Sequence, residues 1–285
     1  MERNDRKIAL TIRFGEGDEA LMKIASEAGF RYVNMGFGDS TFYARDGWEK
    51  QIDRIGNALA KNGLTCVMTH SPYYDLRISA EITEPSMALS QKRVVMATGM
   101  LGAELCALHP RTYLTGGNDR EKSFLCNRDD FLALSELAHE NRTMIGIENL
   151  PIFPGLDMEF YSCYPEQHVR MLEALSDHAV CAVWDFGHAH LMNYDQAEAI
   201  RTVGAALPGG SIRGTHIHNN FKCRDDHLAP SLGTMDWKHV LGALKDTGYK
   251  GYLTMEQDTP VIGLESFIKH LYECAVTLDD IFRAL

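Results

Sequence analysis

The chain has 285 residues, of which 45% are hydrophobic and 24% are charged, and this composition is typical of a globular protein with a sizeable core. Its formal net charge of -11 disfavours a nucleic acid partner, because a polyanion is repelled unless basic residues gather on one face. No run of about 18 apolar residues is present to cross a membrane, and the charged amino terminus does not have the pattern of a signal peptide. We therefore expect a cytoplasmic protein.

Short apolar runs rich in β-branched residues alternate along the chain with longer segments of helical periodicity. The predicted strands cover residues 7–14, 31–37, 65–71, 104–110, 143–150, 180–186, 212–218 and 252–257. Helical segments lie between them, and those at residues 19–30, 48–63 and 237–248 each end near a glycine, a common helix terminator. A last helix is predicted at residues 265–285.

Eight strand–helix units in this length average roughly 36 residues each, which suits an α/β fold with a single (β/α)8 TIM barrel. An open, doubly wound sheet is the alternative, but it usually has fewer strands, and no G-x-G-x-x-G follows the first strand. No linker or low-complexity tract divides the chain. We predict one barrel domain over residues 1–285, with its active site at the C-terminal ends of the strands.

Six successive predicted strands end in a side chain that can bind a divalent ion. These are His70, His109, Glu148, Asp185, His216 and Glu256. Their positions differ by 39, 39, 37, 31 and 40 residues, about one strand–helix unit each, so the side chains should converge at the barrel mouth. Imidazoles and carboxylates without thiolates suit hard or borderline ions. We therefore predict at least one bound divalent ion, and manganese, magnesium, cobalt and zinc all fit this ligand chemistry.

Further polar side chains follow the sixth and seventh predicted strands, namely His188, His218, Arg224, Asp225 and His227. A single histidine after a strand more often forms a cap or an ordinary hydrogen bond, and a single glutamate there can belong to a core ion pair. The whole set is harder to explain in that way. Several carboxylates and imidazoles on one rim are costly to bury together unless a cation joins them.

These residues stand in motifs that resemble the xylose isomerase-like TIM-barrel superfamily. The motifs are THSPY (69–73), LHP (108–110), GIENLP (146–151), WDFGH (184–188), THIHNN (215–220), DDHLAPSLGTMDW (225–237) and TMEQ (254–257). The superfamily holds sugar and sugar-phosphate isomerases and epimerases, inosose dehydratases, and nucleases of the endonuclease IV type (AP endonuclease family 2). The likeness covers nearly the whole chain.

The isomerase and epimerase branch implies one divalent ion held by residues from the last four strands. Carried over to this chain, the ligands are Glu148, Asp185, His216 and Glu256. The two glutamates would also be catalytic, moving a proton between carbons of a ketone by an enediolate-type route while the ion polarises the carbonyl. His188, His218 and Arg224 would contact the substrate, which would be a sugar, a sugar phosphate or a related keto-polyol.

Two alternatives remain open within the same superfamily. The endonuclease IV branch uses three zinc ions to cut abasic DNA, and its extra ligands would be His70, His109, His188, Asp225 and His227. A dehydratase would remove the same proton and then expel hydroxide. Sugar-type members commonly carry an aspartate where this chain has Asn219, and a glycine and a glutamate where it has Ser231 and Leu232. Sugar-acting members are often dimers or tetramers, so the resemblance also implies a homo-oligomer.

Overall fold

The computed structural model describes residues 6–15, 17–38, 45–73, 85–113, 119–153, 158–260 and 262–285. All eight predicted strands are present in a single parallel sheet with the order β10-β1-β2-β3-β4-β5-β8-β9. Their bounds are Ile8–Arg13 (β1), Tyr32–Gly36 (β2), Thr65–His70 (β3), Leu105–Leu108 (β4), Met144–Glu148 (β5), Val180–Asp185 (β8), Ile212–His216 (β9) and Leu253–Met255 (β10). The prediction of eight strands in this chain order is confirmed.

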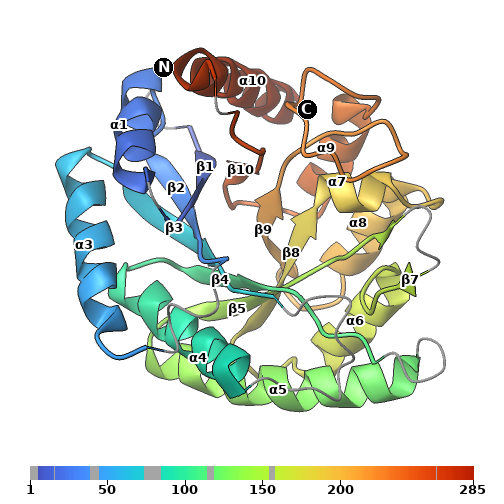
Figure 1. Ribbon diagram of the computed structural model, residues 1–285. Helices are drawn as coiled ribbons and strands as arrows, with labels where there is room; N and C mark the ends of the chain where they lie inside the picture. Colours follow the sequence, from blue (N-terminus) through green and yellow to red (C-terminus); the bar gives the residue numbers. More distant parts are fainter. Residues whose placement is uncertain are drawn as a thin grey trace.

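The sheet curls into a nearly closed barrel, as Figure 1 shows. Its two end strands meet just beyond β9, where Ile217 pairs with Met255 in the parallel direction. The Ile217 amide donates to the Thr254 carbonyl at 2.8 Å, and the Glu256 amide donates back to the Ile217 carbonyl at 3.1 Å. The predicted (β/α)8 TIM barrel is therefore confirmed.

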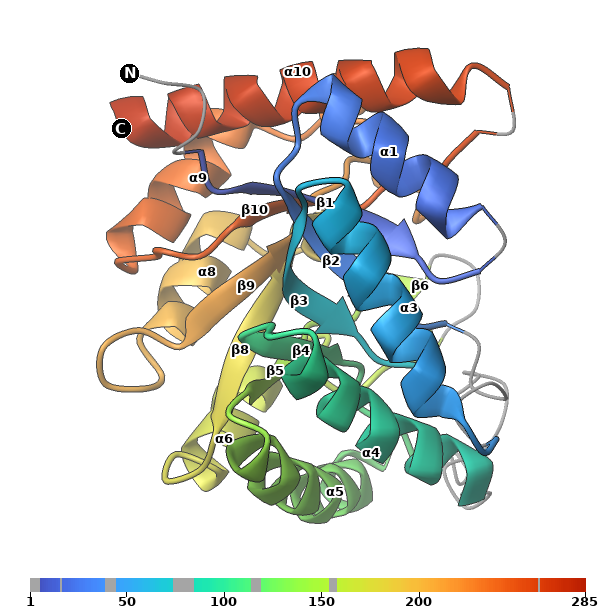
Figure 2. The ribbon, with the colours of Figure 1, turned by 90° about the vertical axis from the view of Figure 1, so that its left-hand side faces the viewer.

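A ring of helices covers the outside of the barrel (Figures 1 and 2). Their bounds are Asp18–Ala28 (α1), Trp48–Lys61 (α3), Pro85–Met100 (α4), Arg120–Glu140 (α5), Pro165–Ala174 (α6), Gln196–Gly204 (α8), Trp237–Asp246 (α9) and Leu264–Ala284 (α10). The three glycines expected to terminate helices, Gly29, Gly63 and Gly248, follow α1, α3 and α9 at positive φ. In the described part of the chain, no helix has both the length and the apolarity needed to cross a membrane.

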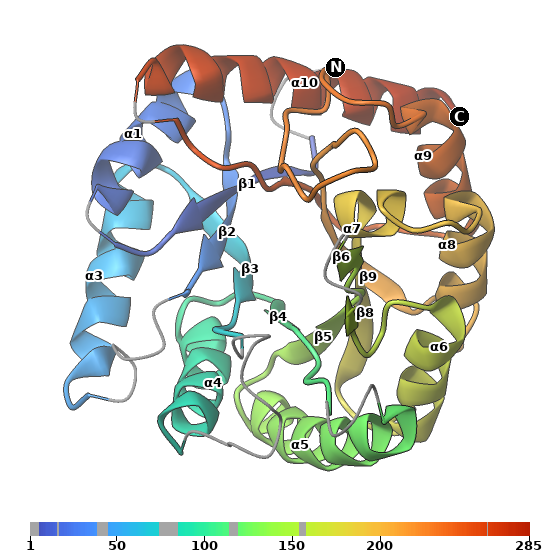
Figure 3. The ribbon, with the colours of Figure 1, turned by 45° about the vertical axis from the view of Figure 1, so that its right-hand side comes forward.

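Two small elements at the carboxyl ends of the strands were not predicted. One is the hairpin of β6 (Ile152–Phe153) and β7 (Met158–Glu159), and the other is the helix α7 (Phe186–His190). Strand β6 lies beside α7 in Figure 3. The Ile152 amide is 3.2 Å from the sulfur of Met192, which lies two residues past the end of α7. Together they cover one side of the barrel mouth.

Beneath the carboxyl ends of the strands, the interior of the barrel is filled by apolar side chains, which include Met68, Leu105 and Val183. Glycines make room for them. A Cβ on Gly146 would lie 2.5 Å from Val183 Cγ2, and one on Gly214 would lie 2.7 Å from Leu105 Cδ2. Directly beneath the mouth the barrel is therefore packed with apolar side chains, and the polar side chains gather at the carboxyl ends of the strands.

Candidate metal centre

The six strand-end side chains converge, as the sequence predicted, around a cavity of about 400 Å³ at the carboxyl ends of the strands. Its polar lining includes His70, His109, Glu148, His188, Asp225, His227 and Glu256. Phe37, Tyr73 and Leu150 supply apolar walls. Asp185 and His216 are fully buried just behind this lining.

Four of the predicted ligands form one compact group, Glu148, Asp185, His216 and Glu256, whose ligand atoms all lie within 4.8 Å of one another. The Nδ1 atom of His216 is 3.0 Å from Glu148 Oε1, 3.5 Å from Glu256 Oε2 and 4.0 Å from Asp185 Oδ2. Metal–ligand bonds of about 2.0–2.2 Å hold neighbouring ligand atoms roughly 3–4 Å apart. The spacing and the donor types therefore fit a single divalent ion.

Glu148 is the residue of this group whose charge is the most costly to bury. It is fully buried, and neither carboxylate oxygen has a well-aligned hydrogen-bond donor among the described residues. Oε1 faces His216, while Oε2 lies 3.3 Å from His70 Nε2 and 3.4 Å from His109 Nε2. Burial alone would raise the pKa of Glu148, but the neighbouring His216 and His109 rings outweigh it and hold the pKa well below its ordinary value. An ionised carboxylate at this depth requires nearby positive charge.

Asp185 ends β8 and at the same time begins α7. Its Oδ1 accepts from the His188 amide at 2.6 Å, so the carboxylate caps the short helix. The Nε2 atom of His218 is 3.0 Å from Oδ1 and 3.1 Å from Oδ2. Asn149 holds the backbone of Asp185 on both sides, accepting from its amide at 2.7 Å and donating to its carbonyl at 2.9 Å. The strand therefore becomes a helix abruptly at this residue, with its carboxylate fixed.

A second candidate ligand group lies beside the first and comprises His188, His218, Asp225 and His227. Asp225 Oδ2 is 3.4 Å from His188 Nε2 and 3.3 Å from His227 Nε2. The rings of His218 and His227 stack with centroids 3.8 Å apart. Burial lowers the pKa of His227, but Asp225 raises it more, to about 9. In the ion-free protein this group therefore balances its carboxylate with protonated imidazoles.

A third group, His70, Glu148 and His216, overlaps the first, and His109 adjoins it with its Nε2 3.2 Å from that of His70. Arg224 differs from the other sequence candidates. Its side chain is 82% exposed, pairs with Asp226 and does not line the cavity. His218 is fully buried against Asp185. Roles for Arg224 and His218 in substrate binding remain predictions.

Sequence reasoning missed several residues that belong to this end of the barrel. Thr11 and Arg13 project from β1 into the cavity, and Arg13 pairs with Asp258 at 2.8 Å. Asn34 lies on β2 directly beside His216. A polar residue inside an otherwise apolar strand was the available signal for Asn34, whereas the pairing of Arg13 with Asp258 depends on barrel closure and has no local signal.

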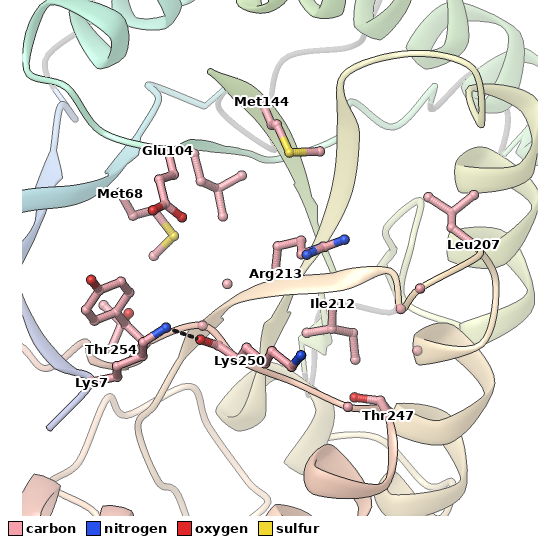
Figure 4. A pocket seen from close by; sticks show the side chains of 18 of the residues that line it. Lys7, Met68, Glu104, Met144, Leu207, Ile212, Arg213, Thr247, Lys250 and Thr254 are labelled. Carbon is pink, nitrogen blue, oxygen red and sulfur yellow. Dashed lines mark hydrogen bonds between the residues drawn. The ribbon is translucent and has the colours of Figure 1, made fainter. Parts of the chain in front are cut away.

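A larger cavity than that of the candidate metal centre, about 1000 Å³, lies at the opposite end of the barrel (Figure 4). Lys7, Glu104, Arg213 and Lys250 are among the side chains around it, and the Lys7 ammonium donates to the Lys250 carbonyl at 2.7 Å. None of the candidate ligand groups in the described chain lies there. Because TIM-barrel chemistry sits at the carboxyl ends of the strands, we take the smaller cavity as the functional one.

Comparison with known proteins identifies the family and supports the fold. The family described as xylose isomerase-like TIM barrel matches residues 22–274. D-psicose 3-epimerase of Enterocloster bolteae is 26% identical over 168 residues, which cover 59% of this chain and 51% of that protein. Two other curated relatives are uncharacterized proteins, and across the three the match spans between 37% and 64% of the relative's length.

Two solved structures superpose along almost the whole barrel. L-ribulose 3-epimerase has a TM-score of 0.76 at 14% identity, covering 98% of this chain and 96% of its own. AP endonuclease family 2 from Brucella melitensis has a TM-score of 0.68 at 18% identity, covering 92% of this chain and 95% of its own. At these identities the likeness shows the fold. The sequence match over most of the chain shows more, and the protein belongs to the xylose isomerase-like TIM barrel family.

Proposed function

We propose that the protein is a divalent-metal-dependent isomerase or epimerase of a carbohydrate. The observation that carries the proposal is the buried group of Glu148, Asp185, His216 and Glu256 beside a cavity of about 400 Å³. Such a cavity is within the usual size range of small-molecule sites. The named relatives that act on ketoses, D-psicose 3-epimerase and L-ribulose 3-epimerase, support a substrate of the same class.

The four residues would hold the ion, which when bound supplies Lewis-acid polarisation of a substrate carbonyl. Glu148 and Glu256 both line the cavity, so each carboxylate can exchange a proton with a substrate carbon. The low pKa of Glu148 keeps that residue ionised and ready to accept a proton at neutral pH. His188 donates its Nδ1–H to the Asn149 carbonyl at 2.9 Å, which turns Nε2 toward the cavity to meet a substrate oxygen.

The proposal is tested by measuring whether a carbon-bound hydrogen of the substrate exchanges with the solvent. We expect the manganese-loaded protein in deuterated water to exchange a C–H hydrogen next to the carbonyl of D-psicose or L-ribulose, and to interconvert epimers, as followed by NMR. Glu256→Gln at saturating manganese should slow the exchange by about 10²–10⁴-fold, the usual contribution of a general acid or base. Glu121→Gln, on an exposed ion pair with Arg170, is the matched control and should exchange at the wild-type rate.

The result also separates related reactions. Exchange accompanied by loss of water, with a dehydrated product in the spectrum, would indicate an inosose dehydratase-like lyase instead. No exchange with any ketose, sugar phosphate or keto-polyol under metal-replete conditions would overturn the proposal.

The second candidate is a zinc-dependent phosphodiesterase that acts on abasic DNA. The observation in its favour is that His70, His109, His188, Asp225 and His227 all gather around the first ligand group. It predicts chelator-sensitive cutting of an abasic duplex and three zinc ions per chain. The net charge of -11 weighs against a DNA substrate, so we rank it second. A cytoplasmic location and a homo-oligomeric assembly are further parts of the proposal.

A further inference from the structure

Asn34 is a buried polar residue that contacts His216 of the candidate metal centre. Its side chain is fully buried in β2, with Nδ2 3.1 Å from Thr11 Oγ1 and 3.4 Å from His216 Nε2. Its Oδ1 has no partner among the described residues. Burying an amide oxygen without a partner destabilises the fold, because the oxygen gives up its hydrogen bonds to water. A leucine would fill similar space without this cost, so the amide calls for a functional reason.

The histidines around the cavity suggest that reason. Three of them place Nδ1 against a backbone carbonyl, and these are His70 on Ser71 (2.8 Å), His188 on Asn149 (2.9 Å) and His227 on Glu256 (3.0 Å). Each carbonyl accepts the Nδ1–H, so in the neutral form of each ring the Nε2 lone pair faces the site. In these three rings the backbone selects the tautomer.

His216 has the opposite orientation. Its Nδ1 faces Glu148 and Glu256, at 3.0 Å and 3.5 Å, and is therefore the nitrogen that would bind an ion. A neutral imidazole has one N–H and one lone pair, so binding through Nδ1 requires the proton on Nε2. That Nε2–H then needs an acceptor, and the side chain that meets it is Asn34.

We propose that Asn34 is a positioning residue for the metal centre, with its Oδ1 accepting the His216 Nε2–H whenever Nδ1 binds a divalent ion. Turning the amide by 180° exchanges Oδ1 and Nδ2 with almost no change of shape, and Oδ1 can then accept from both the Thr11 hydroxyl and the His216 Nε2–H. Nδ2 then takes the position without a partner, so the gain lies in fixing the His216 tautomer. This inference rests on the metal site of the proposed function. It adds a residue that is separated from His216 by two strands, β10 and β1, in the closed barrel.

Two substitutions separate this role from simple space filling. Asn34→Leu keeps the volume but removes the acceptor, and it should weaken zinc or manganese binding about 10–100-fold, the usual cost of losing such a partner. Asn34→Asp keeps an acceptor, and it should bind the ion as tightly as the wild type or more tightly. Competition with a chromophoric chelator measures these affinities. Thermal unfolding of the ion-free variants reports whether the fold is intact.

A second readout does not depend on Asn34→Leu being stable. In the zinc-loaded wild type, long-range proton–nitrogen NMR of the histidine rings should place the His216 proton on Nε2 in a slowly exchanging N–H. A proton on Nδ1, or a folded Asn34→Leu with unchanged ion affinity, would overturn the inference. A wild type that binds no ion would overturn the metal site and this inference together, whereas tight binding without ketose turnover would overturn only the proposed reaction.

Discussion

A substitution at Gly187 in α7 tests how rigidly the side chains around the candidate metal centre are held. A Cβ at this position would lie 2.0 Å from Cε1 and 2.1 Å from Nδ1 of the His218 ring. That ring is fully buried, stacks on His227 and meets the Asp185 carboxylate at 3.0 Å. Gly187→Ala therefore forces His218 to move and to give up its contact with Asp185.

The energy terms have opposite signs. Overpacking costs about 1–3 kcal/mol, loss of a hydrogen bond to a charged group costs about 1.5–3 kcal/mol, and replacing glycine by alanine in a helix gains about 1 kcal/mol. We expect a net loss of about 2–4 kcal/mol in the free energy of unfolding. The affinity for manganese should also fall, because Asp185 loses a donor that fixes its carboxylate.

Gly242 in α9 is the matched control, because its nearest neighbour would be Leu285 Cδ1 at 4.0 Å. Gly242→Ala should stabilise the protein by about 0.5–1 kcal/mol and leave manganese affinity unchanged. Urea unfolding of the ion-free proteins and a manganese titration measure both effects. If Gly187→Ala were also stabilising, the His218 ring would not be fixed as described and the reasoning would fail.

Three further predictions concern the ion, pH and a helix cap. Manganese at 100 times its dissociation constant should add about 2.7 kcal/mol of stability, so a chelator should lower Tm, and an unchanged Tm would contradict the metal site. Burial lowers the pKa of His216, but Glu148 and Glu256 raise it to about 9, and the pKa of His227 is likewise about 9. A histidine with a higher pKa in the folded state than in the unfolded state, where it is about 6.5, stabilises the fold fully below about pH 6.5. This stabilisation is lost as the pH rises to about 9, so the free energy of unfolding of the ion-free protein should fall between about pH 6.5 and 9. Manganese affinity should rise over the same range because protons compete with the ion, and flat urea-unfolding and titration profiles would refute this. Asp195→Ala removes the α8 cap on the Ala197 and Glu198 amides and should cost about 1 kcal/mol in urea unfolding without changing manganese affinity.

The barrel and the gathering of carboxylates and imidazoles at its strand ends were predictable because both follow from short-range patterns. A buried parallel strand reads as a continuous apolar run, as at residues 180–184, and the first polar residue after it marks the carboxyl end. Eight such runs predict a barrel, and a barrel brings its strand ends together. Glu148 and Glu256 could therefore be placed in one site although 108 residues separate them.

Other features could not be predicted from the sequence, because they depend on contacts between residues that are distant along the chain. The helix α7 has five residues and the strands of the β6–β7 hairpin have two each, too few for a periodic pattern. The sequence placed His218 near the substrate, but its position against Asp185 follows from the space that Gly187 leaves for the ring. Which nitrogen of His216 faces the carboxylates likewise depends on residues distant in the sequence, because Asn34 lies beside Nε2 and Glu148 beside Nδ1.

The protonation of the histidines in the two candidate ligand groups affects how many ions the site could hold. Glu148 directs Oε1 toward the first group and Oε2 toward His70 and His109, and burial lowers the pKa of His109, which favours a neutral ring that can donate an N–H. One ion in the first group therefore leaves both oxygens of Glu148 with partners. In the second group, burial lowers the pKa of His188, but Asp185 and Asp225 raise it well above its ordinary value. An ion in the first group must displace the proton on one ring, His216, whereas an ion in the second group must displace protons on two rings, His188 and His227. At neutral pH this proton competition weighs more against the further ions, in line with the single ion of the proposed sugar chemistry.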